Sequence, residues 1–245
     1  MLNPHFAEMV ALAKRSGCFS GIDTTTNGLL LNPKLNREII CAGLTRINIS
    51  VEGLSGEAYQ KICGVSIDFE QFRANIEDLY KHKGNCHIFI KTVAEEEVTA
   101  GQITNAEKER QFKKIFGDIC DEISFEYPTP SWPGFDLKTA TPETGVYGHQ
   151  VRSCEVCPYI FYGMPVNSDG TVSICFADWN RQALNGDVRN YTIPELWNMM
   201  DRYRIAHLTG RRKIMPGCDE CMQPEFTAID RIDEFRDEIL AKMRH

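Results

Sequence analysis

The sequence predicts an α/β protein in which parallel βα units are followed by a small cysteine-rich module. Three observations lead to this fold class. Helical segments alternate with single strands through the first half, a loop-rich stretch follows, and half of the ten cysteines crowd into the last third. We expect the first module to span residues 1–135 and the second to span residues 136–245.

The chain opens with two helix and strand pairs. Apolar residues at helical spacing predict a helix over residues 6–13, and an extended run follows at 19–25. A second helix over 33–41 begins with proline and is closed by Gly43. Residues 45–51 then alternate apolar and polar side chains, which predicts a strand with one buried face.

The same alternation continues for two more units. Residues 69–82 place apolar side chains at helical spacing, and 87–93 form a β-rich run. A helix near 106–115 precedes a fourth strand at 119–127. Single strands separated by helices predict a parallel sheet, whose ligand sites lie at the carboxyl ends of the strands.

The second module follows a connection at residues 128–148 that is rich in proline and other breakers. Residues 164–166 and 172–175 flank an Asp-Gly pair, which is typical of a hairpin. Two helices are expected after it, near residues 193–207 and 226–243.

Composition limits the class of protein. The net charge is -7, which argues against a nucleic-acid partner that is held by phosphate neutralisation. No apolar run approaches the roughly 18 residues of a membrane span, and the first residues do not resemble a signal peptide. We therefore expect a cytoplasmic protein without a membrane or nucleic-acid partner. One basic cluster, formed by residues 202, 204, 211, 212 and 213, is interpreted as the solvated end of a helix rather than an anion site.

The late cysteines predict a metal centre. Cys218 and Cys221 are separated by two residues, and the expected hairpin brings Cys157 and Cys175 together as a second pair. Four thiolates suit either a structural zinc ion or an iron-sulfur cluster, and spacing leaves the two nearly equal. Cys154 also forms a two-residue pair with Cys157, so a zinc site on 154, 157, 218 and 221 is the chief alternative. The earlier, scattered cysteines are interpreted as core residues.

The spacing Cys157, Gly170, Cys175, followed by Cys218 and Cys221, resembles the SPASM and twitch modules that follow radical S-adenosylmethionine barrels. Residues 167–172, 186–188 and 193–197 agree with this pattern. The resemblance implies a [4Fe-4S] auxiliary cluster on these four cysteines. Because no cysteine follows Cys221, the likeness is to a shortened, one-cluster version.

The first half is similar to the barrel of the same superfamily. Residues 26–28 and 43–53 resemble the segments that lead the third and fourth barrel strands into the cofactor pocket. By that resemblance Thr26, Asn27, Ser50 and Glu52 would bind S-adenosylmethionine. Six strands are usual there and four are expected here, so the implied fold is a partial radical SAM-type βα barrel.

Two features of that family do not occur in this sequence. These are the Cys-x3-Cys-x2-Cys segment, which binds the cluster that cleaves S-adenosylmethionine, and a later Gly-Gly-Glu stretch. We therefore expect Met1 to be an internal residue of a longer protein, and the first strand to have an unpaired edge that invites self-association. The activity would then be absent from the chain alone, and no catalytic residue is assigned.

For the complete protein the resemblance implies radical oxidation or modification of a peptide, sugar or small molecule, with a reducing partner such as flavodoxin or ferredoxin. The alternative is a non-catalytic scaffold with a structural four-cysteine zinc site, for which the absent radical-cluster cysteines would be the natural state.

Overall fold

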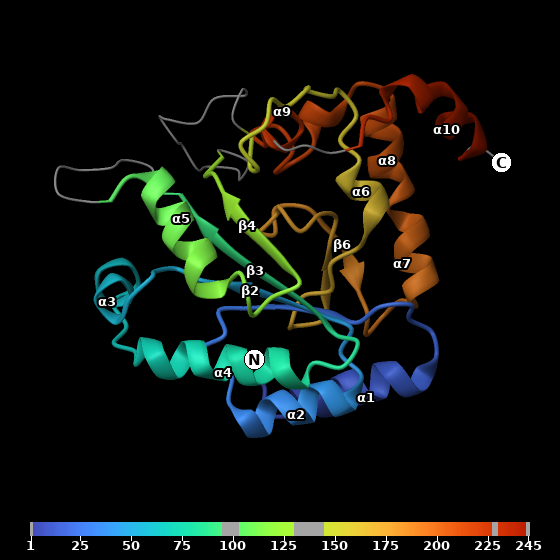
Figure 1. Cartoon of the computed structure of the whole chain (residues 1–245). Coiled ribbons are helices and arrows are strands. Elements are labelled where there is room, and N and C mark those ends of the chain that lie inside the picture. The colour runs from blue at the N-terminus through green and yellow to red at the C-terminus, as the bar shows by residue number, and fades with distance from the viewer. Residues whose placement is uncertain (1, 95–102, 130–144, 227–229, 244–245) are drawn as a thin grey trace. The chain divides into compact units, whose positions relative to one another are not determined.

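A computed structural model describes residues 2–94, 103–129, 145–226 and 230–243 (Figure 1). The chain divides into two compact units, Met1–Glu126 and Tyr127–His245, which are described separately. The boundary expected between residues 135 and 136 falls in the segment 130–144, which lies outside the described residues.

The first unit is a parallel four-stranded sheet with helices between the strands (Figure 1). The strand order is β1-β2-β3-β4, so each strand pairs with the next one in the sequence. Its elements are α1 (Phe6–Ser16), β1 (Asp23–Thr26), α2 (Pro33–Ala42), β2 (Arg46–Ser50), α3 (Gly56–Cys63), α4 (Phe69–His82), β3 (His87–Val93), α5 (Asn105–Phe116) and β4 (Glu122–Glu126). The predicted α/β class with parallel βα units is confirmed.

The core of this unit lies between the sheet and the helices on one of its faces. Ile47, Ile49, Ile88 and Ile90 are fully buried, because alternate side chains of β2 and β3 point to this face. Phe116 closes the core from α5, with its ring 6.4 Å from that of Phe72 in α4 and 5.6 Å from that of Phe112.

The first strand is shorter than expected. Pairing with β2 begins at Asp23, opposite Arg46, and Phe19 in the preceding residues is 60% exposed. In the part of the chain that the structure describes, β1 pairs with β2 alone, so it forms one edge of the sheet. Self-association through that edge remains a prediction.

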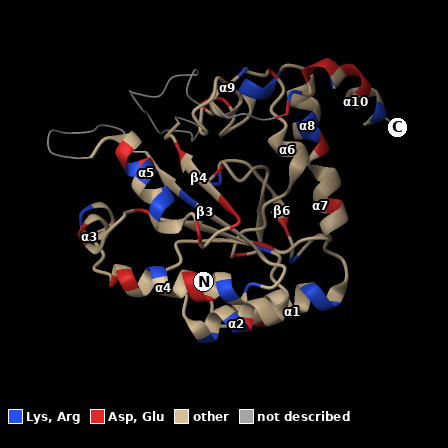
Figure 2. Ribbon diagram, in the orientation of Figure 1, with Lys and Arg blue, Asp and Glu red and all other residues tan. Residues whose placement is uncertain are grey.

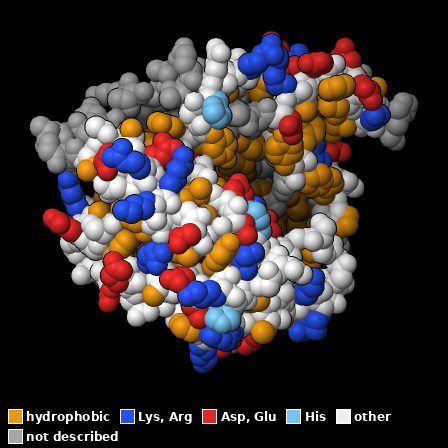
Figure 3. Space-filling model, in the orientation of Figure 1, with side chains coloured by type: hydrophobic (Ala, Val, Ile, Leu, Met, Phe, Trp, Pro, Cys, Tyr) orange, Lys and Arg blue, Asp and Glu red, His pale blue; other side chains and the backbone are white. Residues whose placement is uncertain are grey.

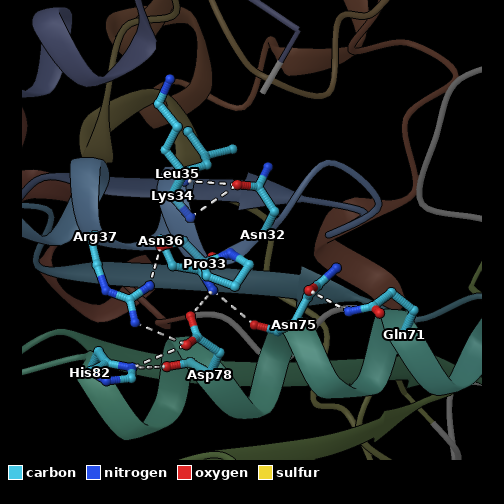
Figure 4. Close-up of polar contacts among 10 residues, drawn as sticks. All are labelled: Asn32, Pro33, Lys34, Leu35, Asn36, Arg37, Gln71, Asn75, Asp78 and His82. Carbon is cyan, nitrogen blue, oxygen red and sulfur yellow. Dashed lines mark hydrogen bonds and ion pairs between the residues drawn. The ribbon is translucent and has the colours of Figure 1, made fainter.

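Helix α2 begins where the sequence supplies both a cap and a proline. The side chain of Asn32 accepts hydrogen bonds from the backbone N–H groups of Lys34 and Leu35, and Pro33 occupies the first turn (Figure 4). One turn later, the amide of Asn36 crosses to α4, where it donates to the Asn75 carbonyl and to Asp78, each at 2.9 Å (Figure 4). Asn36 therefore fixes the position of α2 on α4.

We expect Asn36→Ala to lower the free energy of unfolding of the first unit by about 2 kcal/mol. Asn36 is fully buried, and its loss leaves the Asn75 carbonyl and part of the Asp78 carboxylate without their partner. The matched control is Gln71→Ala. It removes an exposed amide that donates a hydrogen bond to the Asn75 side chain, and both residues belong to α4. Urea unfolding followed by circular dichroism should separate the two variants, and equal midpoints would contradict this role for Asn36.

The second unit is built of short elements around a two-stranded antiparallel sheet. They are α6 (Tyr159–Tyr162), β5 (Thr171–Ser173), β6 (Leu184–Asp187), α7 (Ile193–Met199), α8 (Asp201–Leu208), η1 (Arg212–Ile214), α9 (Gln223–Phe226), η2 (Asp233–Phe235) and α10 (Arg236–Lys242). The expected hairpin is present in reduced form, since Val166 forms an isolated antiparallel bridge with Val172 across the turn at Gly170. The main partner of β5 is instead β6.

The two late helices differ from expectation. The helix expected over 193–207 is divided into two at Met200. At this point the backbone N–H of Tyr203 donates to the carbonyl of Met200, only three residues earlier in the chain. The continuous helix expected over 226–243 is also wrong. Gln223–Phe226 ends as α9, residues 227–229 lie outside the described part, and α10 begins only at Arg236.

Charged residues of both signs are interleaved along the ribbons of α4 and α5 (Figure 2). Lys81 of α4 pairs with Glu77, and Lys113 of α5 pairs with Glu109, each one helical turn apart. Of the helices that the structure describes, none combines the length and apolar character that crossing a bilayer requires.

Candidate metal centre

Four cysteines of the second unit line one small cavity. Cys157, Cys175, Cys218 and Cys221 form its wall together with apolar side chains such as Ile160 and Ile174. These are the four residues predicted as ligands from the sequence. The structure thus brings together thiols that are up to 64 positions apart, the difference between residues 157 and 221.

The cysteines of the cavity lie in loops next to different secondary-structure elements. Cys157 lies two residues before α6, and Cys175 lies two residues after β5. Cys218 follows Gly217, whose φ of 76° is easily adopted only without a side chain. A Cβ at Gly217 would also stand 3.3 Å from Asp178 Oδ1, so the turn packs tightly against the loop that follows Cys175.

Backbone N–H groups are directed at three of the sulfur atoms. Ala177 donates to Cys175 Sγ at 3.4 Å, and Tyr159 and Gln223 provide backbone hydrogen bonds to the thiols of Cys157 and Cys221. In each case the donor is two residues after the cysteine. Such donors stabilise thiolates, which are the form that binds metals.

Burial acts in the opposite direction on the same thiols. Burial, with a smaller contribution from the neighbouring cysteines, raises the pKa of Cys157 and of Cys218 to about 12 and that of Cys175 to about 11. A set of thiols that repel one another once ionised, in a low-dielectric cavity, needs a cation among them before they deprotonate.

Before any metal is inserted, we expect iodoacetamide at pH 8 to alkylate Cys18 and Cys41 but not Cys157. Cys18 and Cys41 are exposed, whereas Cys157 is 6% exposed with a pKa of about 12 instead of 9. Three units of pKa leave about a thousandfold less of the reactive thiolate. Peptide mass spectrometry gives the labelling at each position, and it should rise at Cys157 only as the pH approaches 12. Equal labelling of all three at pH 8 would refute the burial argument.

Arg212 holds the turn that carries two of the cysteines. Its Nη1 donates to the carbonyl oxygens of Cys218 and Cys221, both at 2.9 Å, and its side chain is buried. Arg212 also lines a second, larger cavity of about 900 Å³. The interpretation of the basic cluster as a solvated helix end is therefore wrong for Arg212.

Cys154 faces that larger cavity rather than the one shared by the four cysteines. Its backbone N–H donates to the Pro224 carbonyl, and burial raises the pKa of its thiol to about 11. Cys154 is therefore not among the cysteines that line the smaller cavity, although only two residues stand between it and Cys157.

A second buried arginine fixes the helix beside the cavity. Arg204 in α8 is 4% exposed, and its guanidinium donates to the carbonyls of Ile160 and Trp197 and to the Asp201 carboxylate. It also stacks on the Trp197 ring at 3.8 Å. Arg204 thus joins α8 to α7 and to α6, the helix that follows Cys157, and it too departs from the expected solvated face.

Aromatic side chains surround the start of α6. Tyr159 lines the cavity. Its ring packs edge to face against those of Phe176 and Tyr162, with 4.8 Å and 5.8 Å between the ring centroids. Phe176 follows Cys175 directly and is 51% exposed. Figure 3 shows hydrophobic side chains gathered over the part of the second unit that holds α6 and α8.

The four residues predicted to bind S-adenosylmethionine lie at the carboxyl ends of β1 and β2 in the first unit. Thr26 is buried and its hydroxyl accepts the Gly28 N–H, while Asn27 is exposed and accepts the Leu29 N–H. Ser50 ends β2, and the backbone N–H of Glu52 donates to the Tyr59 hydroxyl. The structure brings all four to one edge of the sheet. Their role as cofactor ligands stays a prediction.

Two further polar residues line the cavity wall, His207 and Asp178. Asp178 belongs to the pattern that resembles the SPASM module, whereas sequence reasoning did not find His207. Asp178 accepts the backbone N–H groups of Gln182 and Ala183, each at 2.8 Å, and so shapes the loop after Cys175. His207 is buried in α8, where burial and the charge of Arg212 lower its pKa to about 4.

The residues of the cavity wall suit an iron-sulfur cluster. Such clusters are held by cysteine thiolates, and hydrogen bonds to sulfur tune them. The four cysteines line one cavity, and a backbone N–H group donates to Cys175 Sγ.

Comparison with known proteins agrees with this geometry. Residues 157–222 match SPASM, a family described as an iron-sulfur cluster-binding domain. The match begins at Cys157 and ends one residue after Cys221, so it includes the four cysteines of the cavity and excludes Cys154. A search of curated proteins found no match.

Two solved structures are similar to the chain at low identity. One is the crystal structure of BtrN in complex with AdoMet and 2-DOIA, which is 14% identical with a TM-score of 0.47. The other is SeMet BtrN in an open conformation, which is 15% identical with a TM-score of 0.30. Each match covers 89% of this chain, which spans 66% of the first BtrN chain and 79% of the second. It is the cysteine geometry and the family match that show that the chain carries a SPASM iron-sulfur cluster-binding domain over residues 157–222.

Proposed function

We propose that Cys157, Cys175, Cys218 and Cys221 hold one [4Fe-4S] auxiliary cluster, in a chain that forms the greater part of a radical S-adenosylmethionine enzyme. The observation that carries this proposal is the convergence of these four thiols on one cavity inside the SPASM segment. Four cysteines give each iron of such a cluster its own thiolate.

When bound, a cluster of this kind supplies one-electron redox chemistry, and its potential depends on burial and on hydrogen bonds to sulfur. The residues of this chain would bind it through four thiolates and direct a backbone N–H group at Cys175 Sγ. Its role in the reaction would be to accept an electron from the substrate or to hold the substrate directly.

The first unit would contribute the S-adenosylmethionine site. Thr26, Asn27, Ser50 and Glu52 lie at the carboxyl ends of β1 and β2, where parallel sheets bind their ligands, and their short or acidic side chains suit the ribose and amino-acid ends of the cofactor. The radical-generating step would belong to the complete protein, because this sequence holds no Cys-x3-Cys-x2-Cys segment.

The reaction would be the oxidation or modification of a peptide, a sugar or a small molecule, with electrons from a carrier such as flavodoxin or ferredoxin. Ten cysteines without disulfides among the described residues suit the reducing cytoplasm, which we propose as the location.

Anaerobic reconstitution with iron and sulfide, followed by analysis of iron, sulfide and zinc, tests the cluster. We expect about four irons and four sulfides for each chain, with a brown protein that bleaches on reduction. Stoichiometric zinc without sulfide would overturn the proposal and favour the scaffold with a structural zinc site.

A further inference from the structure

Arg212 is a buried cation whose hydrogen bonds go to neutral groups. It is 8% exposed, and its Nη1 donates to the carbonyl oxygens of Cys218 and Cys221. A guanidinium stays protonated in proteins, and taking a charge out of water is costly unless an opposite charge lies nearby. The two carbonyls satisfy donors of Arg212, but they do not neutralise its charge.

The acidic residues of the larger cavity do not neutralise it either. Glu155 and Asp233 both pair with Arg236, at 2.6 and 3.8 Å. Glu225, the third acid of that wall, forms no ion pair with Arg212 in the described part of the chain. The opposite charge is therefore expected on the other side of Arg212, in the cavity of the four cysteines.

Arg212 is placed to act on that cavity. Within the described ranges it is the one Lys or Arg that lines it. Burial raises the pKa of the Cys218 and Cys221 thiols, and the positive charge of Arg212 opposes that rise at both. Its hydrogen bonds to the backbone of the same two cysteines fix the guanidinium beside them.

We propose that Arg212 is the counter-charge of the cluster, whose buried guanidinium offsets part of the cluster's negative charge and favours its reduced state. This inference rests on the proposed cluster site. Arg212 is neither a ligand nor a catalytic residue, since the four cysteines already provide one thiolate for each iron. It acts through its electric field at the thiolates and the cluster.

The direction of the effect follows from charge. A [4Fe-4S] cluster held by four thiolates carries a net negative charge, and accepting one electron makes it more negative. A fixed positive charge beside the cluster therefore stabilises the reduced state more than the oxidised state. Because Arg212 is buried, salt screens this interaction much less than it would at the surface. The reduction potential is raised.

The test compares the reconstituted wild-type chain with Arg212→Gln and Arg212→Lys. Glutamine keeps an N–H donor for the carbonyls of the turn but has no charge, whereas lysine keeps the charge. At a fixed potential near the wild-type midpoint, we expect the ratio of reduced to oxidised cluster to fall about tenfold in Arg212→Gln, a shift of about 59 mV for one electron. The ratio in Arg212→Lys should stay within about twofold of wild type.

Arg211→Gln is the matched control. Arg211 is the preceding residue, is exposed and donates to the Thr209 hydroxyl, so its loss should leave the ratio unchanged. An unchanged ratio in Arg212→Gln would overturn the inference. Equal falls in the glutamine and lysine variants of Arg212 would also overturn it, because the residue would then act through the shape of the turn rather than through its charge.

A second pair of variants covers the case in which Arg212→Gln does not hold a cluster. Cys154 lines the larger cavity with Arg212, and the charge of Arg212 opposes the rise in pKa that burial causes at its thiol. At pH 8, Cys154→Asp places a carboxylate beside Arg212 and leaves the hydrogen bonds to the turn in place. We expect the ratio to fall in Cys154→Asp but not in Cys154→Asn, which has the same shape without the charge.

Equal ratios in these two variants would overturn the role of Arg212. If the wild-type chain holds four irons and four sulfides while the ratio does not respond to the charge at Arg212, this inference fails and the cluster site stands. If the wild-type chain binds no cluster, both proposals fail.

Discussion

Cys157→Ala should lose the cluster, with bound iron after reconstitution falling roughly tenfold or more below the wild-type level. Changes in the residues around a metal site already cost about 10- to 100-fold in affinity, and removing a ligand costs more. Cys157 lines the cavity with the other three cysteines, and no other thiol of the described chain lines it. Iron and sulfide analysis and visible absorption measure the loss.

Cys154→Ala is the matched control. Two residues separate Cys154 from Cys157, which is the spacing of many metal-ligand pairs, and Cys154 is also buried. It nevertheless lines the larger cavity. We expect this variant to retain wild-type iron and sulfide. If Cys154→Ala instead loses the cluster while Cys157→Ala keeps it, the ligand set must be reassigned to the alternative pair.

Arg204→Met should lower the free energy of unfolding of the second unit by about 3 kcal/mol in the metal-free protein. Methionine fills part of the space but leaves the Ile160 and Trp197 carbonyls without their donor and the Trp197 ring without its cation. Arg202→Met is the control, since Arg202 is exposed and bonds the neighbouring Tyr203 hydroxyl. That change should cost less than about 0.5 kcal/mol.

Tryptophan fluorescence in a urea titration isolates the relevant transition. The two tryptophans in the described part of the chain, Trp179 and Trp197, both belong to the second unit, and Trp197 stacks on Arg204 itself. A midpoint for Arg204→Met equal to that of Arg202→Met would show that the buried guanidinium contributes no net stability.

Local signals explain which elements could be predicted. Helix α2 has an asparagine cap, a proline in its first turn and Gly43 at its end, so propensity and periodicity agree. Helix α3 was missed because it has eight residues and buries only Tyr59, which leaves no periodic apolar stripe to detect. Strand β6 was missed because Asn185 and Gly186 disfavour strands, and its pairing with β5 depends on packing against Leu196.

In the candidate metal centre, too, some residues could be predicted from the sequence and others could not. Cysteine is a rare ligand type with characteristic spacings, so the set that lines the cavity could be predicted from positions 157, 175, 218 and 221. His207 and Arg212 could not be predicted, because a histidine in a helix and an arginine among basic neighbours look like surface residues. Their burial depends on how α8 and the turn after it fold around the cavity.

The strand order of the first unit has a consequence for how the chain folds during synthesis. Each new strand adds to the edge formed by the strand before it, at separations of 23 residues between Asp23 and Arg46 and 33 between Phe89 and Glu122. Every pairing in this sheet joins strands that are consecutive in the sequence. The sheet can therefore form strand by strand during synthesis, starting from its N-terminal side. The cysteine cavity behaves differently, because its wall is complete only after Cys221 has emerged. Cluster insertion should therefore be a late event, which follows the folding of the sheet.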